Sequence, residues 1–204
     1  MRTDIKVGAL FPDYELPDHT NTKRKLSQLQ GMDPMVIMLG RGIYCPKDRQ
    51  QLRQLVDFSS QMDVGFSRIV YINCDNLILS NDLRLGMGAH WPFLRDENRT
   101  IMHDLEIQEY TDPHNNPMIP HTFVLEPGLK IYKIYNGYWY WGRPSMAELH
   151  QDLRDITMKC RYDFKIDTIE MRAQWERNER DNFYPYGKSW EEVFIRMAGD
   201  VDKF

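Results

Sequence analysis

The apolar residues of this chain recur with two different spacings. Residues 35–39 and 68–73 form short, nearly continuous apolar runs, which are typical of strands buried on both faces. Between these runs, Leu52, Leu55 and Val56 recur at the spacing of one helical face, with charged residues opposite. The pattern therefore predicts a strand, a turn, a helix and a second strand in succession.

The alternation continues in the following part of the chain. Residues 76–86 and 96–107 predict helices, the first of them ending at a glycine. Residues 121–126 and 130–135 are β-rich runs joined by Pro-Gly-Leu, which predicts a hairpin. Residues 145–148 read Ser-Met-Ala-Glu, the spacing of a capping box that opens a helix. Together these elements predict an α/β fold with a central mixed β-sheet flanked by helices.

The end of the chain has a different character. We expect a main domain at residues 1–159 and a helical, aromatic-rich C-terminal extension at residues 160–204. Two cap signals, at residues 167–170 and 189–192, each predict the start of a helix there. One predicted helical face carries Trp190, Val193, Phe194 and Met197. This much aromatic surface has to pack on the main domain or on a second subunit, so a homodimer is the predicted assembly.

Length and charge narrow the function classes. A chain of 204 residues that is 42% hydrophobic can bury its own core. The balance of 26 basic and 30 acidic residues gives no electrostatic footprint for nucleic acid or an anionic membrane. The first residues are charged where a secretory peptide is apolar, and no stretch approaches the ~20 apolar residues of a membrane span. We therefore expect a soluble, cytoplasmic protein that binds neither nucleic acid nor membrane.

The chain has three cysteines, Cys45, Cys74 and Cys160. They are too few and too far apart for a zinc site, and an odd number in a reducing compartment indicates free thiols. The histidines offer no metal-ligand spacing either, so the sequence predicts no metal and no cofactor. The informative question is whether one of the thiols is reactive.

Cys45 has the local setting of a reactive cysteine. Pro46 fits the first position of the helix predicted after the strand at 35–39, and this places Cys45 at the N-cap. There its sulfur faces unpaired amides and the positive end of the helix dipole, which favours thiolate over thiol. A helix terminus contributes only about 0.3 to 1 kcal/mol, so a nearby cation is needed. Arg41 is favoured over Arg49, because a loop arginine can turn inward.

Asp48 lies three residues after Cys45, on the same side of the first helical turn. Two roles are open for it: an ordinary partner of the helix dipole, or a group that transfers protons. Its negative charge opposes a thiolate unless an arginine neutralises it. Arg41 is therefore expected to pair either with the thiolate or with Asp48.

Several segments resemble, in order, the peroxiredoxin-like (alkyl hydroperoxide reductase and thiol-specific antioxidant) branch of the thioredoxin superfamily. The residues from Arg41, Arg-Gly-Ile-Tyr-Cys-Pro-Lys-Asp, are similar to that branch's Arg-Gly-x-Trp-Cys-Pro-x-Cys. The other similar segments are 7–18 with 26–31, 93–99, 119–125 and 142–145. The resemblance runs from about residue 5 to residue 157 and implies a thioredoxin-like fold.

The resemblance also implies a mechanism. Cys45 would attack the O–O bond of a peroxide and become a sulfenic acid, which a second thiol must reduce. Cys74 follows the neighbouring strand and is the candidate resolving thiol, or simply a small residue that ends a buried strand. An external donor of the thioredoxin or glutathione type is the simpler reductant.

Two neighbouring residues are further site candidates that the resemblance implies. Pro120 corresponds to the cis proline of the fold, which lies beside the reactive cysteine and has a structural or a substrate-binding role. His121 is a candidate proton donor if its side chain faces the site, and strand alternation leaves the opposite orientation equally open.

The chain departs from the family at functional positions. Asp48 stands where dithiol members have a second cysteine, which excludes disulfide exchange within this turn. The proline and threonine of the stricter peroxiredoxin motif are absent at Met38 and Gly42, and the second active-site arginine has no match at Ile119 or Pro120.

Three hypotheses therefore stand. The leading one is an antioxidant thiol peroxidase, an oxidoreductase that uses one cysteine. The others are a redox-inactive thioredoxin-fold binding module and a monothiol exchanger that acts on disulfides.

Overall fold

The computed structural model describes residues 1–138, 141–161, 164–165, 167–184, 187 and 189–191. The chain forms two compact units, Met1–Ile156 and Thr157–Phe204. Within the described residues, no helix has the length and apolar character needed to cross a bilayer.

The first unit is built on a five-stranded sheet with the order β5-β4-β3-β6-β7. β3 and β4 are parallel, as are β4 and β5, whereas β6 is antiparallel to β3 and β7 is antiparallel to β6. The predicted mixed sheet is therefore confirmed. Its strands are β3 (Met35–Leu39), β4 (Arg68–Asn73), β5 (Phe93–Arg95), β6 (His121–Glu126) and β7 (Lys130–Asn136). A separate hairpin pairs β1 (Glu15–Pro17) with β2 (Lys23–Lys25).

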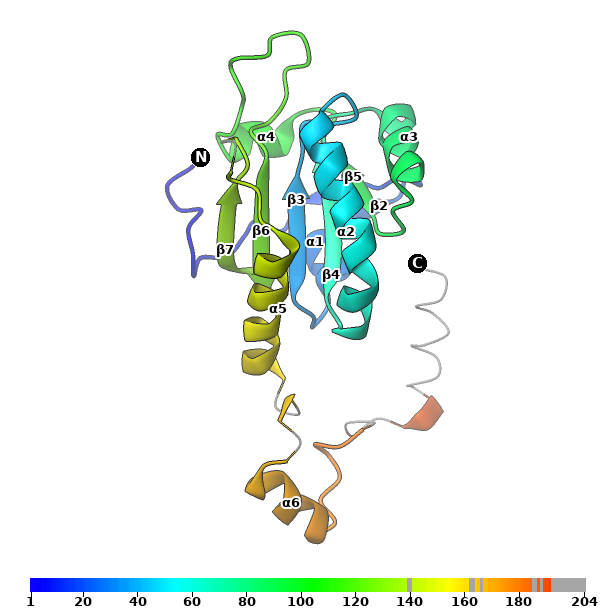
Figure 1. Cartoon of the computed structure of the whole chain (residues 1–204), viewed down its shortest axis with the longest axis vertical. Helices are drawn as coiled ribbons and strands as arrows, with labels where there is room; N and C mark the ends of the chain where they lie inside the picture. The colour runs from blue at the N-terminus through cyan, green and yellow to red at the C-terminus, as the bar shows by residue number, and fades with distance from the viewer. Residues whose placement is uncertain (139–140, 162–163, 166, 185–186, 188, 192–204) are drawn as a thin grey trace. The chain divides into compact units, whose positions relative to one another are not determined.

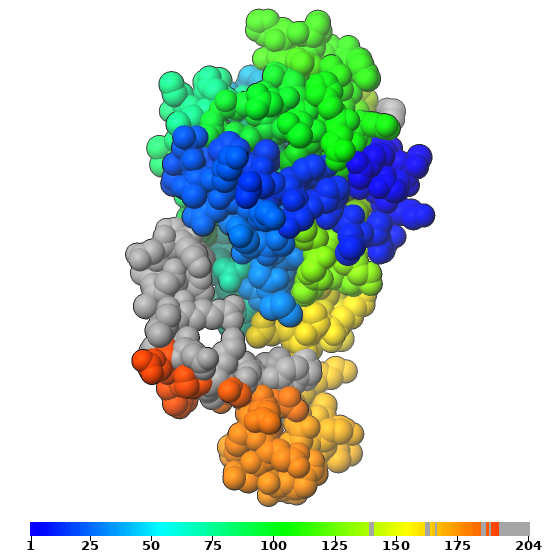
Figure 2. All heavy atoms as spheres, turned by 180° about the vertical axis from the view of Figure 1, so that it is seen from behind, coloured from blue at the N-terminus to red at the C-terminus, as the bar shows by residue number. Residues whose placement is uncertain are grey.

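Helices and loops cover both faces of the sheet. α2 and α5 lie across one face (Figure 1), where Leu52 and Leu149 belong to one buried cluster. The N-terminal segment lies across the other face (Figure 2), where Phe11 and Ile101 belong to a second cluster. The helices of this unit are α1 (Leu26–Gln30), α2 (Pro46–Val64), α3 (Leu77–Met87), α4 (Thr100–Asp104) and the part up to Ile156 of α5 (Met146–Cys160).

The helix predicted at residues 96–107 is shorter than expected. Only Thr100–Asp104 is helical, and the short strand β5 before it was not predicted. The Asp96 carboxylate accepts hydrogen bonds from the amides of Ile101 and Met102, at 3.0 and 3.1 Å. Arg99 has a φ of 59°. A left-handed residue cannot continue a right-handed helix, so the helix begins after it.

The other boundaries follow the sequence closely. α3 ends at Met87, one residue later than predicted, and its C-cap is Gly88, which has a φ of 71°. The hairpin of β6 and β7 forms as predicted. The capping box also forms, since the Glu148 amide donates to Ser145 Oγ at 3.2 Å and the Ser145 amide donates to the glutamate carboxylate at 2.9 Å.

The second unit contains α6 (Ile169–Glu176). Its cap is Thr168, which accepts from the Met171 amide at 3.2 Å, so the cap predicted at Asp167 is one residue too early. The guanidinium of Arg180 lies 3.8 Å from the ring centroid of Trp175. The cap signal predicted at 189–192 lies only partly within the described residues, since residue 192 is outside them. Of the predicted helical face, Val193, Phe194 and Met197 lie outside the described residues. The boundary after residue 159 and the homodimer stay predictions.

A tight turn joins β3 to α2 and places Cys45 at the helix start. Gly42 has a φ of 111°, and a Cβ built on it would lie 2.6 Å from Asp75 Oδ1. The same aspartate accepts from the Ile43 amide at 2.7 Å. Glycine is thus the residue that this turn requires. A threonine here, as in the family's motif, would be strained at this φ and would place its Cβ against the Asp75 carboxylate.

The conformation of Gly42 can be tested through stability. We expect Gly42→Ala to lower the free energy of unfolding by about 1–3 kcal/mol, because alanine is strained at this φ and meets Asp75. Gly86→Ala is the matched control, because Gly86 lies in the last turn of α3 with nothing near its Cβ position. It should raise stability by up to about 1 kcal/mol. Urea unfolding measures both, and equal effects of the two substitutions would contradict the assignment.

Candidate functional site

Cys45 is the N-cap of α2, with Pro46 as the first helical residue, as the sequence predicts. Its side chain, however, makes no hydrogen bond to the first amides of the helix. The first amides of the helix, which the sulfur was expected to face, therefore donate no hydrogen bond to it. The side chain is 1% exposed and faces a pocket. Stabilisation of a negatively charged sulfur would then have to come from the charged side chains that line the pocket.

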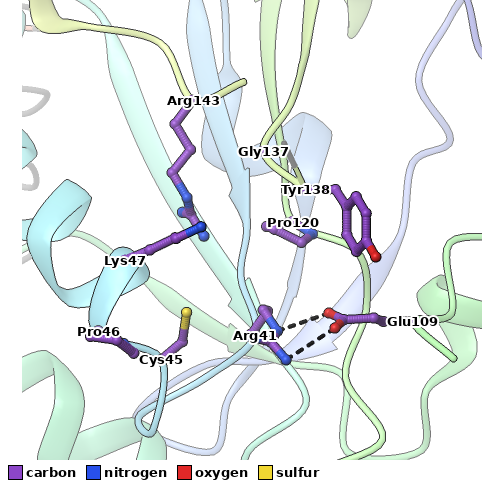
Figure 3. Close-up of a pocket in the computed structure, with 9 residues that line it drawn as sticks. All are labelled: Arg41, Cys45, Pro46, Lys47, Glu109, Pro120, Gly137, Tyr138 and Arg143. Carbon is purple, nitrogen blue, oxygen red and sulfur yellow. Dashed lines mark hydrogen bonds and ion pairs between the residues drawn. The ribbon is translucent and has the colours of Figure 1, made fainter. Parts of the chain in front are cut away.

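The pocket has a volume of about 150 Å³ and brings together four parts of the chain: the turn and first residues of α2, the segment before β6, the end of the β6–β7 hairpin and the segment before α5. The sulfur of Cys45 and the side chains of Lys47 and Arg143 point toward the same space (Figure 3). The lining residues are Arg41, Cys45, Pro46, Lys47, Glu109, Pro120, Gly137, Tyr138 and Arg143.

Asp48 lies behind this pocket, outside its lining, and has no exposed surface. Its Oδ2 accepts hydrogen bonds from the backbone amides of Arg41 and Gly42, at 2.5 and 3.2 Å, and from the Tyr71 hydroxyl at 3.3 Å. Its Oδ1 forms an ion pair with the guanidinium of Arg143. One carboxylate therefore holds both the turn before Cys45 and an arginine of the pocket.

Arg143 is a functional candidate that the sequence analysis missed. Its Nη1 donates to Gln51 Oε1 at 2.6 Å, and its Nη2 is paired with Asp48. Both partners are on α2, so the guanidinium is fixed beside the first turn of that helix. In the sequence, residues 142–145 stand out only as one of the segments that resemble the family. Asp48 and Arg143 are 95 residues apart in the sequence, so no local pattern could predict their ion pair.

The side chain of Arg41 makes different contacts from those predicted. Its Nε lies 2.8 Å from Glu109 Oε2 and its Nη2 lies 3.1 Å from Asp112 Oδ2. Only its backbone amide contacts Asp48, so a side-chain pair between the two is not formed. Burial acts to lower the pKa of Arg41, but its acidic neighbours Tyr44, Glu109 and Cys45, together with a hydrogen bond to Cys45, leave that pKa raised. Arg41 is therefore a cation in contact with the sulfur.

Pro120 lies in the pocket lining, as the resemblance implies. Its carbonyl accepts a hydrogen bond from the Gly137 amide at 2.8 Å. This bond ties the end of the β6–β7 hairpin to the segment before β6. The proline thus has a structural contact and also faces the space in front of Cys45.

His121 and Cys74 are not among the lining residues. His121 is buried, with Nδ1 2.8 Å from the Ile119 carbonyl oxygen, and burial lowers its pKa. Its ring stacks on Phe123, which belongs to the core on the face away from α2. Cys74 packs against the same core, and burial raises its pKa to about 12. The roles of proton donor and resolving thiol stay predictions, and neither gains support from this geometry.

Comparisons with known proteins agree with this architecture. The sequence profile described as the AhpC/TSA family matches residues 7–134. No protein among the curated sequences matches the chain. Among solved structures, the chain is similar to peroxidoxin BcpB from Mycobacterium tuberculosis, with 21% identity, a TM-score of 0.63 and coverage of 75% of this chain and 97% of the other.

Two further solved structures share the fold at lower identity. Peroxiredoxin 6 of Arenicola marina is 18% identical, with a TM-score of 0.62 and coverage of 79% of this chain and 76% of the other. A yeast mitochondrial 1-Cys peroxiredoxin is 13% identical, with a TM-score of 0.61 and coverage of 76% and 78%. The predicted thioredoxin-like fold is therefore confirmed.

The contribution of Arg143 to Cys45 reactivity can be measured directly. In Arg143→Met the cation is lost and the charge of Asp48 is left uncompensated, so both changes disfavour a negative sulfur. We expect alkylation of Cys45 by iodoacetamide at pH 7 to slow roughly five- to tenfold, since ~1 kcal/mol of lost charge stabilisation is about a factor of five.

Arg49→Met is the matched control for this experiment. Arg49 is on the same helix but does not line the pocket. Its substitution should change the alkylation rate less than about twofold, because its guanidinium is not part of the pocket lining and is partly screened by solvent. Similar rates in Arg143→Met and wild type would show that the guanidinium does not act on the sulfur.

Proposed function

The chain belongs to the AhpC/TSA family, and we propose from this premise that it is a thiol peroxidase with Cys45 as its single nucleophile. The observation that carries the proposal is the pocket in which the Cys45 sulfur faces two fixed guanidinium groups, those of Arg41 and Arg143. A cysteine that lines a pocket beside two cations has the electropositive setting of a reactive thiol.

The pocket supplies what the reduction of a peroxide requires. The Cys45 thiolate attacks one peroxide oxygen, an S–O bond forms and the O–O bond breaks. The sulfur is oxidised to a sulfenic acid, and the departing oxygen takes a proton to give water or an alcohol. Negative charge develops on that oxygen in the transition state. The N–H groups of Arg41 and Arg143 are the donors placed to stabilise it.

Asp48 serves this chemistry as a positioning residue. It fixes Arg143 through an ion pair and the turn through two amide bonds. A preorganised donor stabilises developing charge without having to reorient during the reaction. Asp48 also stands at the position of the second cysteine in dithiol relatives, so the turn cannot form its own disulfide.

We propose an external thiol as the reductant. The raised pKa of Cys74, about 12, keeps that thiol protonated near neutral pH and makes it a poor internal partner. An external thiol would condense with the sulfenic acid to a mixed disulfide and water, and a second thiol would release Cys45. The yeast mitochondrial 1-Cys peroxiredoxin is resolved by the glutathione and thioredoxin systems, and a donor of either type fits here.

Replacement of Cys45 tests the proposal. Wild type should consume hydrogen peroxide in the presence of excess glutathione, and Cys45→Ser should lose at least about two orders of magnitude in rate, because an alcohol cannot replace the thiolate nucleophile. Cys160→Ser is the control, because this exposed cysteine belongs to the second unit. Equal rates in wild type and Cys45→Ser would leave the chain as a binding module. Reduction of a mixed disulfide without consumption of peroxide would make it a monothiol exchanger.

A further inference from the structure

One guanidinium group has two kinds of partner at the candidate site. Arg41 forms a hydrogen bond with Cys45, and its Nε lies 2.8 Å from Glu109 Oε2. Its Nη2 lies 3.1 Å from Glu109 Oε1 and 3.1 Å from Asp112 Oδ2. The Arg41 side chain lies between Cys45 and Glu109 (Figure 3). The cation that contacts the sulfur is therefore shared with two carboxylates from the loop between α4 and β6.

Both carboxylates are fixed by their own loop. Glu109 is buried, its Oε1 accepts a hydrogen bond from the Thr111 hydroxyl at 2.7 Å, and its amide donates to the Pro117 carbonyl at 3.0 Å. Asp112 Oδ1 accepts from the Asn115 amide at 3.1 Å. The two acids therefore hold defined positions beside the guanidinium group.

A carboxylate beside this guanidinium opposes a negative charge on the sulfur. An opposite charge nearby favours the ionised form of an acidic group, and a like charge disfavours it. Arg41 favours a Cys45 thiolate, whereas Glu109, which lines the same pocket, disfavours it. Glu109 is only 7% exposed, so solvent screens its charge weakly. The effect of Arg41 on the sulfur is therefore smaller than that of a guanidinium without a carboxylate partner.

The other charged groups at the pocket do not cancel this effect. Lys47 lines the pocket but is exposed, so solvent screens its charge. Arg143 also lines the pocket, and it has its own buried carboxylate partner in Asp48. Asp48 lies behind the pocket, whereas Glu109 is part of its lining. Glu109 is therefore the acid whose charge acts most directly on the space in front of the sulfur.

We propose that Glu109 is a positioning residue that restrains the reactivity of Cys45, because it fixes Arg41 beside the sulfur and offsets part of its charge. The thiolate is consequently less favoured than the guanidinium groups alone would make it. The catalytic consequence rests on the proposed function, since a smaller thiolate fraction slows the attack on a peroxide. The restraint itself acts on the reaction of Cys45 with any electrophile.

The pH dependence of Cys45 alkylation tests this restraint. Glu109→Gln removes the negative charge and keeps an oxygen that can accept a hydrogen bond from Arg41. Alkylation by iodoacetamide would be followed on the peptide that contains Cys45 by mass spectrometry. We expect the pH of half-maximal rate to fall by about 0.5 to 1 unit. Well below that pH, the rate should rise about three- to tenfold, because the thiolate fraction there changes about tenfold for each unit.

The rate at high pH distinguishes this role from a structural one. Where the thiol is fully ionised, Glu109→Gln should change the alkylation rate less than about twofold, because the charge no longer affects the thiolate fraction. A residue that only supports the fold would alter access to the sulfur, which changes the rate at every pH and leaves the half-maximal pH in place. That result would overturn the proposal.

Glu106→Gln is the matched control, because it makes the same chemical change at an exposed residue of the same segment, outside the pocket lining. It should leave the pH profile unchanged. Asp112→Asn is a second test, because Asp112 also pairs with Arg41 without lining the pocket, and its half-maximal pH should fall by a smaller amount. An unchanged or raised half-maximal pH in Glu109→Gln would overturn the proposal. If that variant does not fold, the same result in Asp112→Asn overturns it.

A peroxide measurement separates this proposal from the function on which it rests. If wild type consumes hydrogen peroxide, Glu109→Gln should raise kcat/KM at each pH where it accelerates alkylation, and a rate that does not rise would overturn the catalytic part of the proposal. A lowered half-maximal pH in a protein that consumes no peroxide would retain the restraint and reject the thiol peroxidase. An unchanged half-maximal pH in a protein that consumes peroxide would overturn the restraint and leave the proposed function standing.

Discussion

The candidate site depends on one buried carboxylate. Asp48 has no exposed surface, and its two oxygens hold the amides of Arg41 and Gly42 and the guanidinium of Arg143. Removing one partner of a buried ion pair leaves an uncompensated charge, which typically costs about 3–5 kcal/mol. The turn, the start of α2 and the segment before α5 are therefore coupled through this group. The position of Cys45 relative to its cations follows from that coupling.

The departures from the family pattern lie around this site. Gly42 stands at the position of the motif's threonine, with a φ of 111° and with Asp75 next to its Cα. No arginine stands at Ile119 or Pro120, but Arg143 lines the pocket from a different part of the chain. Asp48 replaces the second cysteine and binds that arginine. The substitutions thus form one consistent arrangement around a single thiol.

Local patterns in the sequence predicted much of the fold. The apolar run at 35–39 and Pro46 were sufficient to place Cys45 at the N-cap of α2, because both signals act within a few residues. Periodicity could not show that the Cys45 side chain makes no hydrogen bond to the helix amides. It also could not bring Arg143 to Asp48 or Glu109 to Arg41, because these contacts join residues that lie far apart in the chain. Strand alternation left the orientation of His121 open, and packing on Phe123 decides it.

Identification of the sulfur that a peroxide oxidises tests the central claim most directly. Wild-type protein would be treated with one equivalent of hydrogen peroxide in the presence of dimedone, which traps sulfenic acids, and its peptides would be analysed by mass spectrometry. The account predicts a dimedone adduct on the peptide that contains Cys45, with Cys74 unmodified. An adduct confined to another cysteine, a disulfide between Cys45 and Cys74, or an unmodified Cys45 would contradict it.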